Sequence, residues 1–253
     1  MKRFISILQF MTRIPIKVNT GIDEEFHKTI KYFPLVGLVL GIIIYLVGLL
    51  SSFIFDSFTT SIIIVLSLVI LTGGLHIDGV GDTFDAIYSY RNKERMLEIM
   101  KDSRLGTNSL LAILFLIIFK ISFIFNIIEN ELMWTIMFMP ILGRQGVLTL
   151  MYKTVTPREN GMGNLFIGKA TICDLIISIS TTVVSILGIG ILIFKESILI
   201  IPILSTIVII YMFNILFKKH IYGKIDGITG DILGCSIELN ELIYIVSIYA
   251  LLC

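Results

Sequence analysis

Three aspartates, Asp78, Asp82 and Asp85, stand at positions i, i+4 and i+7 of a glycine-rich stretch that begins at Gly73. On a helix this spacing places the three carboxylates on one face. Like charges so close repel one another, so a cation, a proton or a basic partner must neutralise them. A helix start needs only one or two acids, and three along one stripe indicate a metal site. Because all these ligands are oxygens, the expected ion is hard, Mg²⁺ or Mn²⁺.

Basic and polar residues that could bind a phosphate flank this stretch. His76 lies inside it and could bind a phosphate when protonated, or could be an ordinary interfacial histidine. The segment 91–107 has apolar residues on one side and predicts an amphipathic helix at the interface. One interpretation is that Arg95 and Arg104 bind phosphates and Asp102 joins the acidic site. The other is a basic anchor on anionic lipid.

A second polar group occupies the last apolar segment. Asp231 and Glu238 share a helical face, and Glu241 continues it one turn later. Carboxylates in an apolar helix are costly in lipid, so we expect them to face the first cluster across an aqueous cavity. Arg144 lies among small residues that allow close helix packing, and it is expected to face an internal polar site. Lys120 has only apolar neighbours in the sequence, and no role is predicted for it.

The composition indicates which elements must position these residues. Of 253 residues, 56% are hydrophobic and 15% are charged, with a mean hydropathy of +0.95, whereas soluble domains carry about 25% charged residues. The chain is therefore expected to be an all-α, polytopic integral membrane helix bundle forming a single domain over 1–253. Its N-terminus predicts a short amphipathic helix. About seven transmembrane helices are expected, over 33–55, 58–75, 109–128, 132–152, 172–194, 197–217 and 232–253.

The distribution of positive charge predicts the orientation. Segments 1–32, 76–108, 153–171 and 218–231 together hold 17 of the 20 Lys and Arg residues. The intervening connections contain only Lys195. The positive-inside rule therefore places the N-terminus, the basic segments and the polar site on the cytoplasmic side of the cell membrane.

At these residues the sequence resembles the cobalamin synthase (adenosylcobinamide-GDP ribazoletransferase) family. The matching stretches span almost the whole chain and are Phe10 to Pro15, Pro34 to Gly37, Gly73 to Asp85, Arg95 to Thr107, Gly143-Arg144 and Thr229 to Gly234 with Glu238 and Glu241. The sequence departs from the family pattern at Ala86, where glycine is common, and at Asn108-Ser109, which replace Tyr-Gly.

The resemblance implies transfer of the adenosylcobinamide phosphate moiety of adenosylcobinamide-GDP to α-ribazole or its 5′-phosphate. The products would be adenosylcobalamin, or its 5′-phosphate, and GMP, with Mg²⁺ required. It implies membrane lipid as surroundings and no nucleic-acid partner, and it leaves both a monomer and a homo-oligomer open. The metal would be held by Asp78, Asp82, Asp85 and Asp231, and either Asp82 or Asp85 would be the general base. The expected substrate-binding residues are His76, Arg95, Asp102, Arg104, Arg144, Glu238 and Glu241.

Two further functions stay open at this point. A membrane CDP-alcohol phosphotransferase uses similar metal-assisted chemistry, but its motif is only partly met from Asp82 onward. A cation or small-solute transporter would place acids near the bilayer midplane and show internal repeats. Here the acids lie near the cytoplasmic ends of the predicted spans, and no convincing repeat is found.

Overall fold

The computed structural model describes residues 2–18, 20–196 and 200–252, and within them every named element is a helix. The predicted span over 197–217 therefore starts, and that over 232–253 ends, outside the described residues. The α-helices are α1 (Lys2–Met11), α2 (Phe33–Ser52), α3 (Ser57–Thr72), α4 (Leu75–Ile87), α5 (Lys93–Ile99), α6 (Thr107–Glu129), α7 (Met139–Gly146), α8 (Leu148–Met151), α9 (Ile172–Leu187), α10 (Ile200–Ile225) and α11 (Gly230–Leu252). Short 3₁₀ or π segments are η1 (Phe26–Tyr32), η2 (Met133–Phe138), η3 (Met162–Leu165) and η4 (Gly188–Ile193).

Five continuous helical segments are long and apolar enough to cross a membrane, or six if the bent pair α3 and α4 is one span. The five are Phe26–Ser52, Thr107–Glu129, Ile172–Ile193, Ile200–Ile225 and Gly230–Leu252. Many large apolar side chains on them are exposed, such as Leu46, Val184 and Leu216, as expected for helices surrounded by lipid. The membrane helix bundle is confirmed, and the predicted number of about seven spans is approximate.

The predicted span over 132–152 is not one continuous helix. It is divided into η2, α7 and α8, with Pro140 in the first turn of α7. Gly143 and Gly146 lie where a Cβ atom would come within 2.7 Å of Glu241 and 2.4 Å of Ile210, respectively. Close packing against α10 and α11 therefore accounts for the glycines, and the proline accounts for the break.

The chain bends by 91° between α3 and α4. Gly73 and Gly74 both adopt left-handed backbone conformations there, with φ of 65° and 72°, which other residues adopt at a cost. The backbone N–H of Arg13 donates to the Leu71 carbonyl at 2.7 Å and ties the N-terminal segment to this bend. With 13 residues, α4 by itself is too short for a span, and it is not among the five continuous candidate segments.

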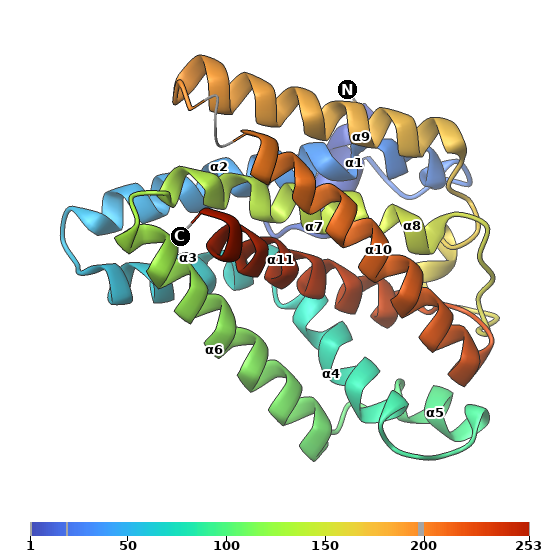
Figure 1. The fold of residues 1–253 in the computed structure, drawn as a ribbon. Helices are drawn as coiled ribbons and strands as arrows, with labels where there is room; N and C mark the ends of the chain where they lie inside the picture. The colour runs from blue at the N-terminus through green and yellow to red at the C-terminus, as the bar shows by residue number, and fades with distance from the viewer. Residues whose placement is uncertain (1, 19, 197–199, 253) are drawn as a thin grey trace.

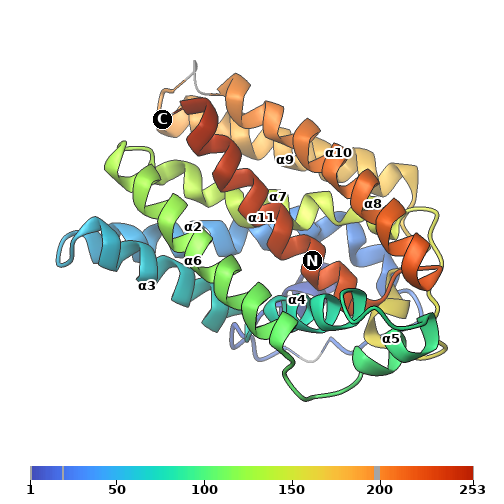
Figure 2. The ribbon, with the colours of Figure 1, turned by 60° about the horizontal axis from the view of Figure 1, so that its bottom comes forward.

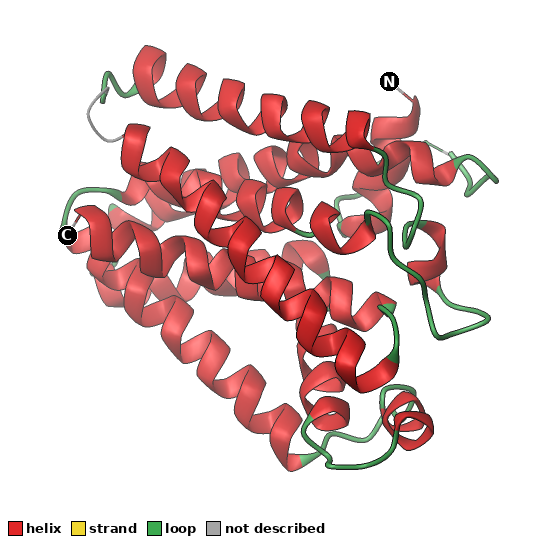
Figure 3. Cartoon of the chain, turned by 45° about the vertical axis from the view of Figure 1, so that its right-hand side comes forward, coloured by secondary structure: helices red, strands yellow, loops and turns green. Residues whose placement is uncertain are grey.

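Helix α11 runs through the middle of the bundle and contacts α4, α6, α7 and α10 (Figures 1 and 2). The α2–α3 and α6–η2 connections and the end of α11 gather at one end of the molecule. The loop before α9 and the α10–α11 loop lie at the other, where Figure 3 shows most of the irregular chain, whereas the α3–α4 bend lies nearer the middle of the bundle. The predicted basic connections, including α5, lie toward this second end, as the alternation of spans requires. Helix α1 packs there with Ile7, Leu8 and Met11 buried, so the amphipathic N-terminal helix is confirmed.

Candidate functional site

The candidate site is a pocket between α4, the start of α11 and the loop that precedes α9. Two glycines allow α4 and α11 to cross closely. A Cβ at Gly79 would lie 2.5 Å from the Asp231 carbonyl oxygen, and one at Gly234 would lie 3.3 Å from the His76 Cα.

This α4–α11 pocket has a volume of about 210 Å³. Its polar lining comes from segments far apart in the sequence: Asp78 and His76 from α4, Asp231 from α11, and Arg158 from the loop. The turn Gly161–Asn164 also borders it. His76 is buried, and its Nε2 has no hydrogen-bond partner in the described structure. The pocket thus combines carboxylates with an arginine and an imidazole, a set suited to a phosphate and its counter-ion.

Asp82 lies one helical turn beyond Asp78 and is electrostatically linked to the pocket. Partial burial, and then the neighbouring carboxylates of Asp231 and Asp78, raise the pKa of Asp82 to about 7, although Arg158 opposes the shift. The charges of Asp231 on α11 and Asp78 on α4 therefore add to burial in disfavouring ionisation of Asp82. A bound cation would relieve that repulsion.

Asp85 has a different role in the structure. Its carboxylate accepts from the backbone N–H groups of Gly106 at 2.7 Å and Ser109 at 2.9 Å. These are amides of the first turn of α6, so Asp85 caps that helix from outside. A Cβ at Gly106 would lie 2.4 Å from the carboxylate, which explains the glycine there. The three aspartates of α4 thus have different roles: Asp78 lines the pocket, and Asp85 caps α6.

We expect Asp85→Ala to lower the free energy of unfolding by about 1–2 kcal/mol because two amides at the start of α6 lose their acceptor. Denaturation of the purified protein in detergent measures this loss. Glu98→Ala provides a control, because Glu98 is an exposed carboxylate paired with Arg95 and is expected to cost much less. Equal stabilities for Asp85→Ala and the wild type would show that the cap is dispensable.

Arg158 is a site residue that the sequence reasoning missed. Its Nη1 lies 2.8 Å from an Asp231 oxygen, and its Nε and Nη2 are buried with no hydrogen-bond partner among the residues that the structure describes. The sequence reasoning counted Arg158 only as one of the charges that orient the chain. The adjacent glycine-rich turn, Gly161-Met162-Gly163-Asn164, was the feature of the sequence that could have indicated a site near Arg158. The side-chain amide of Asn164 donates to the backbone carbonyls of Arg158 and Glu159 at 3.0 Å, which fixes the loop beside the pocket.

Three predicted substrate-binding residues do not line the pocket. Arg95 pairs with Glu98 at 2.6 Å on the exposed helix α5. Arg104 pairs with Asp102, and the guanidinium lowers the pKa of that carboxyl to about 2. Helix α5 covers only seven residues of the amphipathic helix predicted over 91–107. The structure gives Arg95, Asp102 and Arg104 surface ion pairs, and their binding of substrate stays a prediction.

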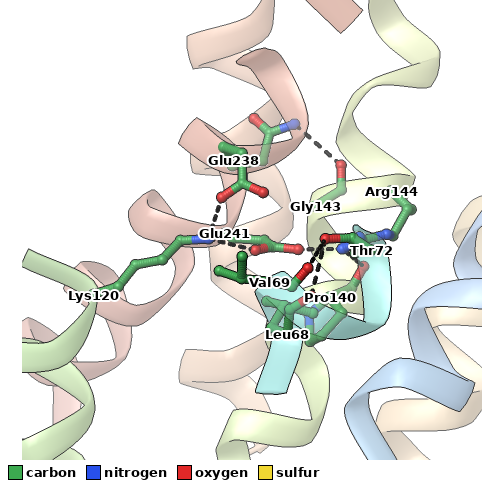
Figure 4. Close-up of polar contacts among 10 residues, drawn as sticks. Leu68, Val69, Thr72, Lys120, Pro140, Gly143, Arg144, Glu238 and Glu241 are labelled. Atoms are coloured by element: carbon green, nitrogen blue, oxygen red, sulfur yellow. Dashed lines mark hydrogen bonds and ion pairs between the residues drawn. The ribbon is translucent and has the colours of Figure 1, made fainter. Parts of the chain in front are cut away.

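The remaining predicted residues form a buried ion network (Figure 4). The Lys120 ammonium lies 2.5 Å from Glu238 and 2.6 Å from Glu241, and Glu241 also pairs with Arg144. All four side chains are at most 4% exposed. The prediction that Glu238 and Glu241 face the aspartates across an aqueous cavity is wrong, because they are neutralised by cations inside the bundle. Arg144 does face an internal polar cluster, and Lys120, for which no role was predicted, belongs to it.

Within the described residues, no three His, Cys, Asp or Glu side chains lie close enough to hold a metal ion by themselves. Magnesium is commonly bound by one or two carboxylates together with waters and substrate phosphates. The oxygen donors and the raised pKa of Asp82 fit an ion of that kind. The fold and pocket define a polytopic helical membrane protein with an acidic, arginine-containing site at one end of the bundle.

Comparison with known proteins identifies the family. Residues 3–249 match the family described as cobalamin-5-phosphate synthase. The chain is 61% identical over 253 residues to an adenosylcobinamide-GDP ribazoletransferase of Clostridioides difficile, covering 100% of this chain and 98% of the relative. A protein of the same name from Alkaliphilus metalliredigens is 45% identical, covering 98% and 95%. No solved structure matches. The chain belongs to the cobalamin-5-phosphate synthase family.

Proposed function

We propose that the protein transfers the adenosylcobinamide phosphate moiety of adenosylcobinamide-GDP to α-ribazole or its 5′-phosphate and releases GMP. The observation that carries this proposal is 61% identity over the entire chain to a relative of that name. The pocket chemistry agrees with it, because the reaction brings a diphosphate to the active site. The family membership also favours this reaction over the CDP-alcohol phosphotransferase and transporter alternatives.

The pocket is proposed to face the cytoplasm across the cell membrane. It lies at the end of the bundle where the basic connections gather (Figure 1). The opposite end carries few cations, and the positive-inside rule assigns the basic end to the cytoplasm. Soluble nucleotide substrates would then reach the pocket directly from that compartment.

Magnesium is proposed as the required cofactor, held by Asp78, Asp82 and Asp231 together with the diphosphate. When bound, Mg²⁺ neutralises charge on the phosphates and favours the displacement. Asp82 is the better candidate for the general base that takes the proton of the attacking ribose hydroxyl, since its carboxyl lies near those of Asp78 and Asp231. The alternative candidate, Asp85, already accepts from two amides of α6.

Arg158 is proposed to bind the substrate phosphate. Among the described residues, two of its nitrogens, Nε and Nη2, have no hydrogen-bond partner, and the third, Nη1, contacts Asp231. A guanidinium in that state can donate to phosphate oxygens without losing existing hydrogen bonds. Its attachment to Asp231 also orients it toward the carboxylates.

We expect Arg158→Gln to lower kcat/KM for adenosylcobinamide-GDP by about 30- to 1,000-fold, because charge-assisted bonds to the phosphates are lost. Steady-state assays of GMP release measure this effect. Arg91→Gln is the matched control, since Arg91 is an exposed arginine of another basic segment. Equal losses in the two variants would point to nonspecific charge attraction and contradict a local role for Arg158.

The proposed function is tested by incubating the purified protein with Mg²⁺, adenosylcobinamide-GDP and α-ribazole 5′-phosphate. GMP and adenosylcobalamin 5′-phosphate are expected in equal amounts, and chelation with EDTA should stop their formation. A protein that releases no GMP here, yet releases CMP from a CDP-alcohol, would contradict the proposal. Ion flux in liposomes without turnover would do so as well.

A further inference from the structure

The α4–α11 pocket has two chemically different parts. Its polar part contains Asp78, Arg158 and Asp231, whereas its apolar part is formed by Phe10, Met11, Phe33, Met151, Phe166 and Ile237. The charged groups account for the binding of a phosphate or a metal ion, but phosphate or metal binding does not require the aromatic part of the pocket. A ligand that fills both parts must carry an anionic group and an apolar, flat group.

The aromatic wall is held in place by ring contacts between separate elements. Phe166 packs edge-on against Phe10 with centroids 5.5 Å apart and against Phe33 at 5.3 Å. Phe26 contacts both Phe10 and Phe166, at 5.5 and 5.7 Å. These contacts join α1, η1 and α2 to the loop before α9, so the rings form a preorganised surface. Such surfaces bind aromatic bases by stacking and van der Waals contact.

The volume limits which part of a substrate can enter. Cavities that enclose a drug-sized ligand measure about 300–1,000 Å³, whereas this one measures about 210 Å³. It can therefore take a bicyclic base and its sugar phosphate in part, but it is too small for a corrin macrocycle. The adenine of the adenosyl group is attached to the corrin and carries no phosphate, so two bases remain for the proposed reaction, the guanine of the GDP moiety and the dimethylbenzimidazole of α-ribazole.

The lining distinguishes these two bases. The edge of guanine carries several donors and acceptors, and burying them against phenylalanine and methionine would leave them unpaired at substantial cost. The side-chain amide of Asn164 is already bound to the Arg158 and Glu159 carbonyls. Dimethylbenzimidazole presents two methyl groups at its outer edge and has a single ring-nitrogen acceptor, so it loses fewer hydrogen bonds than guanine on an apolar wall. On the basis of the proposed function, we infer that this pocket binds the dimethylbenzimidazole base of α-ribazole against Phe10 and Phe166, with the ribose directed toward the charged part of the pocket.

Two variants test this inference. Phe10→Leu removes an aromatic face, and Met162→Trp adds bulk at the pocket mouth on an exposed loop residue. The matched controls are Phe58→Leu and Met212→Trp, which alter exposed side chains outside the pocket. Met212 and Met162 are both 62% exposed. The KM values for α-ribazole 5′-phosphate and for adenosylcobinamide-GDP are measured separately, with wild-type turnover established first.

Each pocket variant is expected to raise the KM for α-ribazole 5′-phosphate about tenfold, with the KM for adenosylcobinamide-GDP within about twofold of the wild-type value and both controls unchanged. A rise confined to adenosylcobinamide-GDP would place the guanine in this pocket and overturn the inference. Unchanged KM values for both substrates in Met162→Trp would overturn it too, even if Phe10→Leu failed to fold. Absence of turnover in the wild type would instead refute the proposed function, and direct binding of α-ribazole 5′-phosphate to the same variants would still test the pocket.

Discussion

Asp82→Asn is expected to reduce the rate of GMP release by about a thousandfold. Asparagine has nearly the same shape as aspartate, but it cannot accept the proton of the attacking hydroxyl and adds no negative charge beside Asp78 and Asp231. Single-turnover assays with saturating substrates measure the chemical step directly.

The same variant is expected to stay folded, which separates a catalytic effect from a structural one. Burial and neighbouring carboxylates raise the pKa of Asp82 from 3.8 to about 7 in the folded protein. A raised carboxyl pKa means that ionisation costs folded-state stability, and this cost grows from about pH 4 and is complete above about pH 7. Asparagine cannot ionise, so at pH 8 the variant should be at least as stable as the wild type. Thermal denaturation at pH 5 and pH 8 measures the difference.

Asp226→Asn is the control for this prediction, because Asp226 is an exposed aspartate at the same end of the bundle. It should retain transfer and stability. Wild-type turnover by Asp82→Asn, with metal dependence preserved, would remove Asp82 from the mechanism. A loss of transfer accompanied by unfolding at pH 8 would assign the residue a structural role.

The sequence was sufficient to predict the membrane fold because lipid imposes a simple rule on the chain. Segments such as Thr107–Glu129 and Ile200–Ile225 are apolar over the length of a span, and no other structure satisfies their backbone hydrogen bonds in hydrocarbon. The break near Pro140 and the 91° bend at Gly73-Gly74 were harder to predict. Hydropathy measures apolar length, and it does not report where close packing or a left-handed turn redirects the chain.

The site was predicted in part for a related reason. Helical spacing places Asp78 and Asp82 one turn apart on α4, but it could not show that Asp85 is turned toward the start of α6. Periodicity within one helix gives no information about which neighbouring element each turn meets. Arg158 lies in an irregular loop, where no periodicity exists, and its pairing with Asp231 depends entirely on the tertiary fold.

The buried ion network is the clearest case in which the sequence does not show which residues meet in space. Lys120 is surrounded by apolar residues in the sequence, yet in the structure it meets two carboxylates more than 100 residues away. A charged side chain in an apolar segment therefore implies a partner, but the sequence does not identify it. Glu238 and Glu241 were assigned to substrate because their cations could not be recognised.

Lys120→Met is expected to lower the free energy of unfolding by about 3–5 kcal/mol, because it leaves Glu238 and Glu241 buried with only Arg144 to neutralise them. Methionine fills a similar volume, so the loss comes from charge and not from a cavity. Denaturation in detergent measures it. Lys169→Met, at an exposed position of a basic segment, is the matched control and should have little effect.

Adding Glu238→Gln to Lys120→Met is expected to recover much of that loss, although each substitution alone is destabilising. The double variant retains the Arg144–Glu241 pair and restores electrical neutrality, whereas Glu238→Gln alone leaves two cations facing one carboxylate. A double-mutant cycle isolates this coupling from the effects of the separate substitutions. Additive losses would show that Lys120 and Glu238 do not stabilise each other. If stability returns together with GMP release, Glu238 acts by holding α11 against α6, whereas recovered stability without GMP release would support the contact with substrate predicted from the sequence.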